Sequence, residues 1–136
     1  MMEEIITYLK KSGIQYFATV GLDGKPKVRP FQFMFEYDNK LWFCTSNEKE
    51  VYKELQKQPY VEICTLGPKM SWIRLEGKVN FSDSLEMKEK VFRVNALVRN
   101  IYKEIDNPLL EVFYLSEVKA TISEIGEKPV VYAMND

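Results

Sequence analysis

The sequence predicts a small antiparallel β-barrel with helices packed against it, and three observations carry this prediction. Short segments rich in aromatic and β-branched residues recur along the chain, as is typical of strands. Tight-turn pairs, Asp23-Gly24 and Asp38-Asn39, separate the early segments. Three other stretches carry apolar residues at helical spacing, which indicates helices that cover a sheet.

The first part of the chain is predicted to be a helix followed by hairpins. In the helix, Met2–Lys11, the apolar residues Ile5, Ile6 and Leu9 share one face, and Gly13 is placed to end it. Strands are then expected over residues 15–21, 27–37 and 40–45.

The rest of the chain is predicted to place two helices among further strands. The shorter helix, Asn47–Lys57, has Val51 and Leu55 four residues apart. The longer helix runs from about Ser84 to Ile105, with Asp83 as its cap. Its apolar residues recur at alternating steps of four and three, which predicts one apolar face: Met87, Val91, Val94, Val98, Ile101 and Ile105. Strands are expected over residues 60–67, 71–81, 111–117, 118–125 and 129–134. In the segment 71–81, apolar and polar residues alternate with the period of a half-buried strand.

Length and composition indicate a single domain over residues 1–136 with a sizeable apolar core, since 46% of the residues are hydrophobic. A net charge of -1, from 19 basic and 20 acidic residues, argues against broad nucleic-acid binding. No apolar run approaches the roughly 18 residues of a membrane helix, and no export signal is seen, so a cytoplasmic protein is expected. Cys44 and Cys64 are expected to be reduced thiols, with a disulfide as the alternative.

The chain contains no histidine. This absence removes Ser-His and Cys-His nucleophilic systems, as well as zinc and haem sites that use histidine ligands. Two cysteines alone cannot complete a structural zinc site, so no metal site is predicted. An enzyme of this composition is expected to take its chemistry from an organic cofactor.

An arginine lies among aromatic residues in the segment 27–37. Strand alternation places Arg29 on the same face as Phe31, Phe33, Phe35 and Tyr37. A guanidinium group there is costly to bury unless it meets an anion or stacks on a ring. The alternative is an arginine at the rim of the barrel, paired with a carboxylate of the chain.

The predicted start of the second helix also has two interpretations. Thr45, Ser46 and Asn47 are good N-cap residues, and Lys49 adds a positive charge to a helix end that suits phosphate. Alternatively, Thr45-x-x-Glu48 is a capping box that satisfies the helix end by itself.

Together the two features predict a shared site. The strand that carries Arg29 is expected beside the strand that ends at Thr45. The Arg29 guanidinium, the hydroxyls and the helix start could therefore meet one anion, with aromatic surface next to it. A phosphate joined to a flat ring is the shape of flavin mononucleotide (FMN).

Three segments in this order, YFATVGLDGKPKVRPFQF, KLWFCTSNEKEVYKELQKQPYVEIC and SWIRLEGKV, resemble a known family. They are similar to the flavin-binding split-barrel family of pyridoxamine 5′-phosphate oxidase, and within it to the small nitroimidazole-resistance-like branch. The resemblance runs from about Gln15 to Val79 and continues in the helix that follows Asp83.

The resemblance implies a mainly β fold with helices (α+β), an antiparallel split β-barrel that binds FMN between the two subunits of a homodimer. Trp72 is expected to reach a neighbouring chain's flavin, or else to plug the barrel or pack on a helix. The residues that the resemblance places at the flavin, its ribityl chain or its phosphate are Arg29, Pro30, Phe31, Gln32, Phe43, Cys44, Thr45, Ser46, Lys49, Ser71 and Trp72.

The chain also departs from the family's pattern. A true pyridoxamine 5′-phosphate oxidase carries a C-terminal segment with arginine and histidine that this sequence lacks, so that substrate is not expected. The histidine common in the nitroimidazole-resistance branch is missing, and Glu48 stands where many relatives have a basic residue.

The function expected from this resemblance is that of an FMN-dependent oxidoreductase acting on an unidentified small molecule, with reduced nicotinamide as a candidate electron donor. One alternative is a flavin-binding protein without turnover that serves as a sensor or store. Another is a dimeric interaction module without a cofactor. No residue is assigned as a catalytic acid or base.

Overall fold

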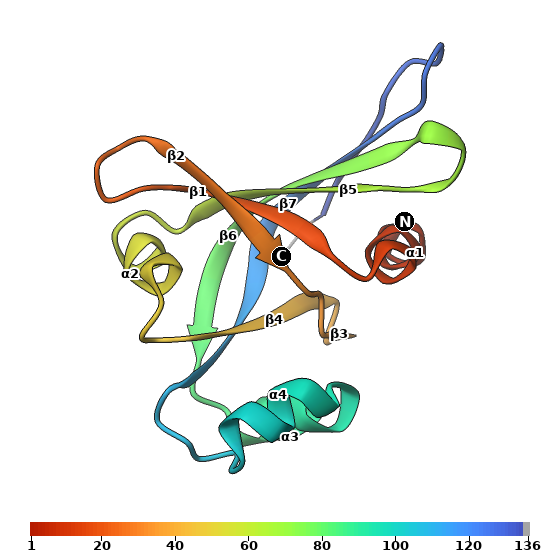
Figure 1. The fold of residues 1–136 in the computed structure, drawn as a ribbon. Coiled ribbons are helices and arrows are strands. Elements are labelled where there is room, and N and C mark those ends of the chain that lie inside the picture. The colour runs from red at the N-terminus through yellow and green to blue at the C-terminus, as the bar shows by residue number, and fades with distance from the viewer. Residues whose placement is uncertain (135–136) are drawn as a thin grey trace.

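The computed structural model describes residues 1–134, which form one antiparallel sheet with helices around it (Figure 1). The strands are β1 (Gln15–Val20), β2 (Pro26–Phe31), β3 (Phe35–Tyr37), β4 (Lys40–Ser46), β5 (Tyr60–Leu66), β6 (Trp72–Ser82), β7 (Leu110–Ser123) and β8 (Val130–Ala133). The helices are α1 (Met2–Ser12), α2 (Glu50–Lys57), α3 (Leu85–Val94) and α4 (Ala96–Tyr102), and a 3₁₀ turn, η1 (Pro68–Met70), joins β5 to β6.

The strands pair in the order β2-β1-β5-β6-β7-β4-β3, and β8 adds to β7. Figure 1 shows the sheet curving so that β4 faces β1 and β2 across the interior. The predicted antiparallel barrel with helices against it is confirmed.

Alternation along β6 shows why these residues form a strand with one buried face. Ile73 and Leu75 are fully buried, whereas Arg74 and Glu76 between and after them are exposed. Each residue therefore points to the face that its polarity favours, as the sequence predicts.

Aromatic rings fill the centre of the barrel. Phe17 of β1, Phe43 of β4 and Phe113 of β7 are each fully buried. Their ring centroids lie 5.7–5.9 Å apart in stacked and edge-to-face arrangements. Such pairs contribute about 0.5–1.5 kcal/mol each beyond the burial of apolar area, so these rings hold the opposite walls of the barrel together.

Helix α1 covers the turn between β5 and β6. It ends at Gly13, whose φ of 73° lies in the left-handed region that glycine adopts without strain, as predicted. The hydroxyl of Tyr8 donates to Ser71 Oγ at 2.9 Å in a buried contact. A Cβ atom at Gly67 would fall 2.1 Å from the Tyr8 ring, so the close approach of helix and turn requires glycine there.

The predicted strand over residues 27–37 is wrong, because the chain leaves the sheet at residues 32–34 and forms two strands, β2 and β3. The buried side chain of Gln15 accepts a hydrogen bond from the Phe33 amide at 2.6 Å and so takes that donor out of the strand ladder. Consequently Phe31 and Phe33 pack in the main core, while Phe35 packs in a second apolar cluster beside α3. The aromatic residues of this segment do not all share one face.

The second predicted helix begins later than expected. Thr45 and Ser46 still belong to β4, and α2 begins at Glu50 after a tight turn. Ser46 Oγ accepts the Glu48 amide at 3.2 Å, and the Ser46 carbonyl accepts the Lys49 amide at 3.1 Å. These bonds stabilise the turn, so the predicted capping box from Thr45 to Glu48 does not form. The predicted burial of Val51 and Leu55 is confirmed.

The long helix predicted over residues 84–105 is two helices that meet at Asn95. The backbone of Asn95 is extended, and its side chain caps α4 by accepting the Val98 amide at 3.0 Å. The cap of α3 is Ser84, which accepts the Met87 amide, and not Asp83. Helix α4 ends at Tyr102, because Lys103 has a φ of 74°.

The two strands predicted over residues 111–117 and 118–125 form one strand, β7. Glu117 has a positive φ of 53°, and the pairing register with β6 shifts between Glu76 and Lys78. This bulge lets a single strand bend and keep its partner on both sides of the bend.

No helix among residues 1–134 is long and apolar enough to cross a membrane.

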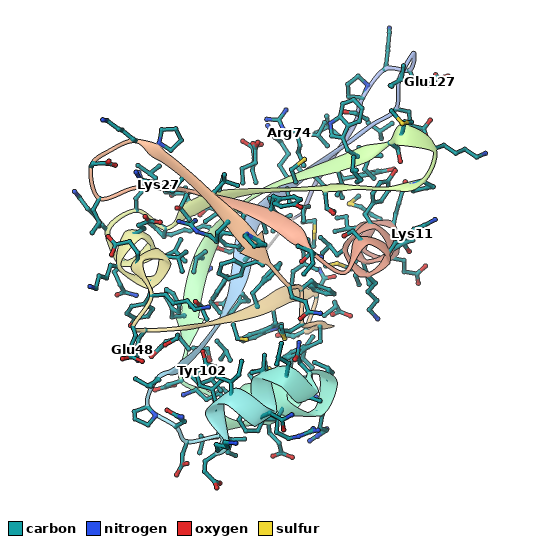
Figure 2. All side chains as sticks on the ribbon, viewed as in Figure 1. Lys11, Lys27, Glu48, Arg74, Tyr102 and Glu127 are labelled. Atoms are coloured by element: carbon teal, nitrogen blue, oxygen red, sulfur yellow. The ribbon has the colours of Figure 1, made fainter. Side chains whose placement is uncertain are left out.

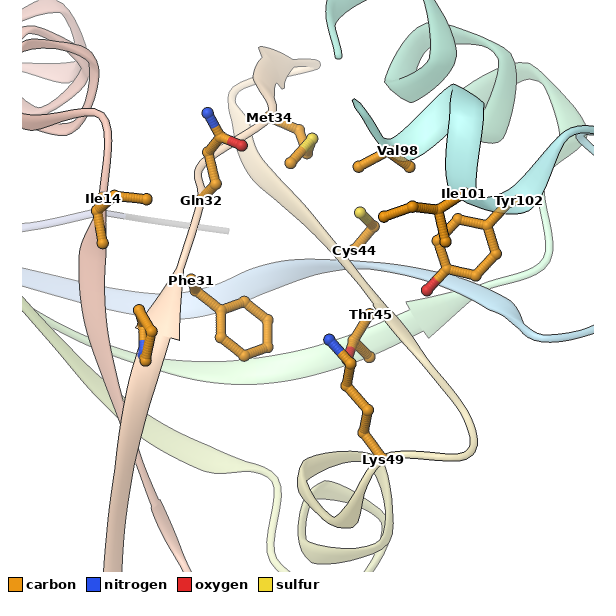
Figure 3. Close-up of a pocket in the computed structure, with 11 residues that line it drawn as sticks. Ile14, Phe31, Gln32, Met34, Cys44, Thr45, Lys49, Val98, Ile101 and Tyr102 are labelled. Carbon is orange, nitrogen blue, oxygen red and sulfur yellow. The ribbon is translucent and has the colours of Figure 1, made fainter. Parts of the chain in front are cut away.

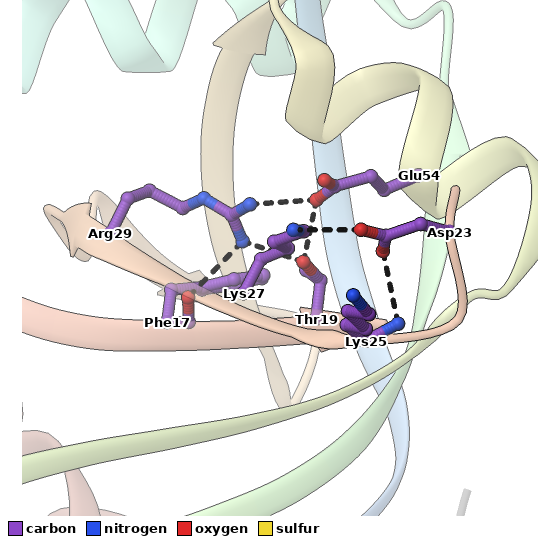
Figure 4. A network of polar contacts seen from close by, with 7 residues as sticks. All are labelled: Phe17, Thr19, Asp23, Lys25, Lys27, Arg29 and Glu54. Carbon is purple, nitrogen blue, oxygen red and sulfur yellow. Dashed lines mark hydrogen bonds and ion pairs between the residues drawn. The ribbon is translucent and has the colours of Figure 1, made fainter. Parts of the chain in front are cut away.

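A buried polar network joins α2 to the hairpin of β1 and β2 (Figure 4). The Glu54 carboxylate, 2% exposed, accepts hydrogen bonds from Arg29 Nη2 and from the Thr19 hydroxyl, both at 2.6 Å. Arg29 Nη1 also donates to Thr19 Oγ1 at 2.7 Å and to the Phe17 carbonyl at 3.3 Å. The network satisfies both charges, and it fixes α2 against the barrel.

We expect Glu54→Ala to lower the free energy of unfolding by about 3 kcal/mol, because it leaves the Arg29 guanidinium largely buried without its carboxylate. Urea denaturation measures this change. The matched control is Glu89→Ala, which breaks an exposed ion pair to Arg93 of similar length, 2.8 Å, and should cost no more than about 0.5 kcal/mol. Equal losses in the two variants would contradict a stabilising role for the buried pair.

Candidate functional site

A pocket of about 290 Å³ opens between the end of β2, strand β4 and helix α4 (Figure 3). Most of its wall is apolar. Thr45, Lys49 and Tyr102 bring polar groups to the end where β4 meets the turn before α2, and the Gln32 amide lies away from that end. The lining residues are Ile14, Pro30, Phe31, Gln32, Met34, Cys44, Thr45, Lys49, Val98, Ile101 and Tyr102. An apolar cavity with a few polar groups at one end is typical of a small-molecule site.

The hydroxyl of Thr45 has no hydrogen-bond partner, and it is the one buried side-chain polar atom in residues 1–134 of which this is true. Thr45 is 3% exposed and lines the pocket from β4. A buried hydroxyl without a partner costs about 1–3 kcal/mol. Such a group in a cavity wall is suited to a ligand that supplies the missing bond.

Lys49 brings a positive charge to the same end of the pocket. Figure 3 shows its amine next to Thr45, and Lys49 forms no ion pair with any residue of the described part of the chain. It also occupies the N-cap position of α2, where free backbone N–H groups favour a negative charge. A hydroxyl, an ammonium group and a helix start together form an environment that suits an anion.

Cys44 lies in the apolar part of the pocket. Burial raises the pKa of its thiol to about 12, and the charge of Lys49 opposes that rise only in part. The thiol is therefore neutral at physiological pH, which suits a packing role and not that of a thiolate nucleophile or metal ligand. No group of three or more acidic, cysteine or histidine side chains within residues 1–134 is arranged to hold a metal.

Tyr102, at the end of α4, points its hydroxyl toward the polar end of the pocket (Figure 3). Burial raises the pKa of this phenol, the negative charge of Glu48 adds to the rise, and a hydrogen bond with the Ser46 side chain opposes it. Figure 2 shows Glu48 and Tyr102 at the same end of the molecule. The phenol remains protonated at neutral pH and can donate a hydrogen bond.

Six of the eleven predicted site residues line this pocket. They are Pro30, Phe31, Gln32, Cys44, Thr45 and Lys49. The segment 30–32 and strand β4 are brought together because both flank the same opening of the barrel. That these residues hold a flavin stays a prediction.

Two of the other predicted residues lie near the pocket without lining it. Arg29 faces a separate polar cavity between the β1–β2 hairpin and α2, where it pairs with Glu54. This arrangement matches the alternative of an arginine paired with a carboxylate. Phe43 is fully buried in the barrel core.

The remaining three predicted residues have other local partners. Ser46 stabilises the turn before α2. Ser71 is fully buried and hydrogen-bonded to Tyr8, and Trp72 is half-buried at the start of β6, opposite Leu66 and Ser123. Alternation correctly predicts that Trp72 does not share the buried face of Ile73. Neither Ser71 nor Trp72 reaches the pocket of its own chain.

Sequence reasoning missed five lining residues: Ile14, Met34, Val98, Ile101 and Tyr102. Val98 and Ile101 belong to the apolar face of the long helix predicted over residues 84–105, a face expected to pack against the barrel. The break at Asn95 redirects them, so that they form a wall of the pocket. The capping preference of asparagine is the one local signal that could have indicated the break.

The model of the pyridoxamine 5′-phosphate oxidase family matches residues 1–123 of the chain. No curated protein matches the sequence. Among solved structures, a NimC/NimA family protein from Clostridium acetobutylicum is 32% identical, with a TM-score of 0.89 over 98% of this chain and 92% of that one.

Two more distant structures share the fold alone. A pyridoxamine 5′-phosphate oxidase-related, FMN-binding protein from Nostoc punctiforme has a TM-score of 0.71 at 18% identity, over 98% of this chain and 96% of that one. A haem-binding protein from Mycobacterium smegmatis has a TM-score of 0.77 at 17% identity, over 97% of this chain and 57% of that one. These comparisons confirm the resemblance and the split-barrel fold.

We expect Thr45→Val to raise the free energy of unfolding of the ligand-free protein by about 1 kcal/mol, because it replaces a buried hydroxyl that has no partner with a methyl group. Thermal or urea unfolding measures the change. The matched control is Thr65→Val, since Thr65 is equally buried but donates to the Ile14 carbonyl at 3.1 Å. That variant should lose about 1 kcal/mol. Destabilisation of the same size in both variants would show that Thr45 has a partner in solution.

Proposed function

Because the chain belongs to the pyridoxamine 5′-phosphate oxidase family, we propose that it binds FMN in the pocket between β2, β4 and α4 and acts as a flavin-dependent oxidoreductase on a small molecule. The observation that carries this proposal is the buried Thr45 hydroxyl, which lacks a partner and lies next to the unpaired Lys49. A ligand with a phosphate group would satisfy both.

The phosphate of FMN would be held at the polar end of the pocket. Thr45 would donate its hydroxyl, Lys49 its ammonium group, and the start of α2 would add backbone N–H groups. Arg29, predicted to assist, is engaged by Glu54, so its contribution would be to fix α2 and thereby the position of Lys49. The residues present therefore fit a phosphate monoester.

The flavin ring would lie against the apolar wall. Phe31 and Met34 line one part of that wall, and Val98 of α4 lines another. These side chains exclude water and offer flat contact, while the Gln32 amide supplies a hydrogen-bonding group at the edge. When bound, FMN would supply the electron-transfer chemistry, and the chain would supply binding, orientation and a dry surrounding.

The substrate class follows from what the chain lacks. Since no histidine is present, the histidine expected in the substrate segment of the oxidase is not reproduced, and we propose a different small molecule reduced at the expense of a donor such as reduced nicotinamide. The second candidate function is flavin binding without turnover. It is favoured by the neutral Cys44 thiol, which is not a nucleophile in this pocket.

We also propose that two copies of the chain form a homodimer that completes the site. The outer face of β1, β2 and β5 carries exposed apolar side chains, among them Tyr16 at 57%, Val28 at 66% and Leu66 at 69%. The pocket rim continues this apolar character, with Ile14 at 44% exposed. A surface of this kind is suited to a two-fold interface. In such a dimer Trp72 could contribute to the partner's flavin site.

We expect Lys49→Ala to weaken FMN binding by about 1.5–3 kcal/mol, the usual value of a charge-assisted hydrogen bond. Fluorescence titration of the flavin measures the affinity. The matched control is Lys53→Ala, one turn further along α2 on its exposed side, which should leave the affinity unchanged. Equal affinity in the wild type and Lys49→Ala would contradict the phosphate site, and failure of the wild-type protein to bind FMN would contradict the proposed function.

For the dimer, light scattering at micromolar concentration should return twice the chain mass of 16.0 kDa. Tyr16→Glu should shift the protein to the single-chain mass, because it buries a charge at the centre of the proposed interface. Leu85→Glu, which alters an apolar residue 52% exposed on α3, serves as the control and should leave the dimer intact. A wild-type mass of one chain would refute the proposal.

A further inference from the structure

We infer that Tyr102 of α4 is a binding residue that makes the pocket select a phosphorylated flavin over the same flavin without phosphate. This inference rests on the proposed FMN site and adds to it a residue from a helix that the sequence assigned to the core. Three different elements then hold the phosphate: β4 through Thr45, the start of α2 through Lys49, and α4 through Tyr102.

The position of the phenol supports this role. Tyr102 lines the pocket together with Thr45 and Lys49, and Figure 3 shows its hydroxyl pointing to the end where those two residues lie. The hydroxyl interacts with the side chain of Ser46, the residue that follows Thr45 in β4. The Tyr102 hydroxyl therefore lies at the same end of the pocket as Thr45 and Lys49.

Packing against the rest of the protein buries little of α4, so it does not explain why Tyr102 lies at the pocket. None of the α4 residues is buried, and Leu97 and Ile101 are 67% and 61% exposed. Val98 packs against the apolar cluster beside α3. Polar contacts also hold the first part of the helix, where Asn95 Nδ2 donates to Gln32 Oε1 at 2.8 Å and Arg99 Nη1 donates to the Phe92 carbonyl at 2.8 Å. A bond from Tyr102 to a ligand would tie the other end of α4 to the pocket.

The chemistry of the phenol suits a phosphate. A tyrosine keeps its proton at neutral pH and so acts as a donor, and burial raises the pKa of Tyr102 further in the same direction. A phosphate dianion only accepts hydrogen bonds, so donors alone can serve it. Glu48 brings a negative charge close to this end, and a neutral donor such as tyrosine adds a bond to the anion without requiring a further charge.

The test compares FMN with riboflavin, which has the same ring and ribityl chain and no phosphate. Dissociation constants of both ligands are measured for the wild type, Tyr102→Phe and Tyr52→Phe. The last variant is the control, since it removes a phenolic hydroxyl from α2 that does not line the pocket. We expect Tyr102→Phe to weaken FMN binding about tenfold, as the loss of one charge-assisted bond does, and to leave riboflavin binding unchanged.

The outcomes separate this inference from the proposed function. A wild type that prefers FMN, together with a Tyr102→Phe variant that keeps the full preference, overturns the role of Tyr102 and leaves the FMN site standing. Equal weakening of FMN and riboflavin by Tyr102→Phe also overturns it, because the phenol would then act on the ring. A wild type that binds both flavins equally, or neither, overturns the phosphate site and this inference with it.

Discussion

Strand β7 is the element on which the rest of the structure depends, because it is hydrogen-bonded to three other strands. Its first residues, Leu110–Tyr114, pair with β4, its last residues pair with β8, and β6 runs along nearly its whole length. A strand can hold partners at such different angles only if it bends, and the bulge at Glu117 provides the bend. The barrel closes around the central phenylalanine rings as a result.

The pocket is a consequence of that closure. Pairing with β7 fixes β4, so that Thr45 lies opposite Glu111 in the ladder with its side chain buried. The two helices that follow β6 then cross below β4, and α4 forms the remaining wall. The site therefore combines two strands of the sheet with one helix, α4, none of whose residues is fully buried.

The polar network around Glu54 and the buried Thr45 hydroxyl differ in whether their hydrogen bonds are made within the chain. Around Glu54 every strong donor and acceptor has a partner within the chain, so the cluster stabilises the fold and offers nothing to a ligand. Thr45 is as deeply buried and has no partner. Arg29 and Thr45 are both expected to hold the same anion. Within the chain, Arg29 is already engaged by Glu54, whereas the Thr45 hydroxyl has no partner among residues 1–134.

The sequence by itself determined the elements whose signal is local. Strand alternation in β6, the turns at Asp23-Gly24 and Asp38-Asn39, the end of α1 at Gly13 and the antiparallel class all depend on neighbouring residues, and the resemblance of the segments around Arg29 and Thr45 gave the family. Six of the predicted site residues reach one pocket because four of them lie on β2 and β4, while Gln32 and Lys49 come shortly after these two strands.

Only the tertiary structure decided where those elements are interrupted and which charges pair. The strand over residues 27–37 ends early because Gln15, 18 positions away, binds the Phe33 amide, and Arg29 is taken up by Glu54, 25 positions away. The break at Asn95 similarly turns an expected core face into a pocket wall and brings Tyr102 to Thr45. Periodicity records which face of an element is apolar, but it contains no information on which distant polar group will meet that face once the chain has folded.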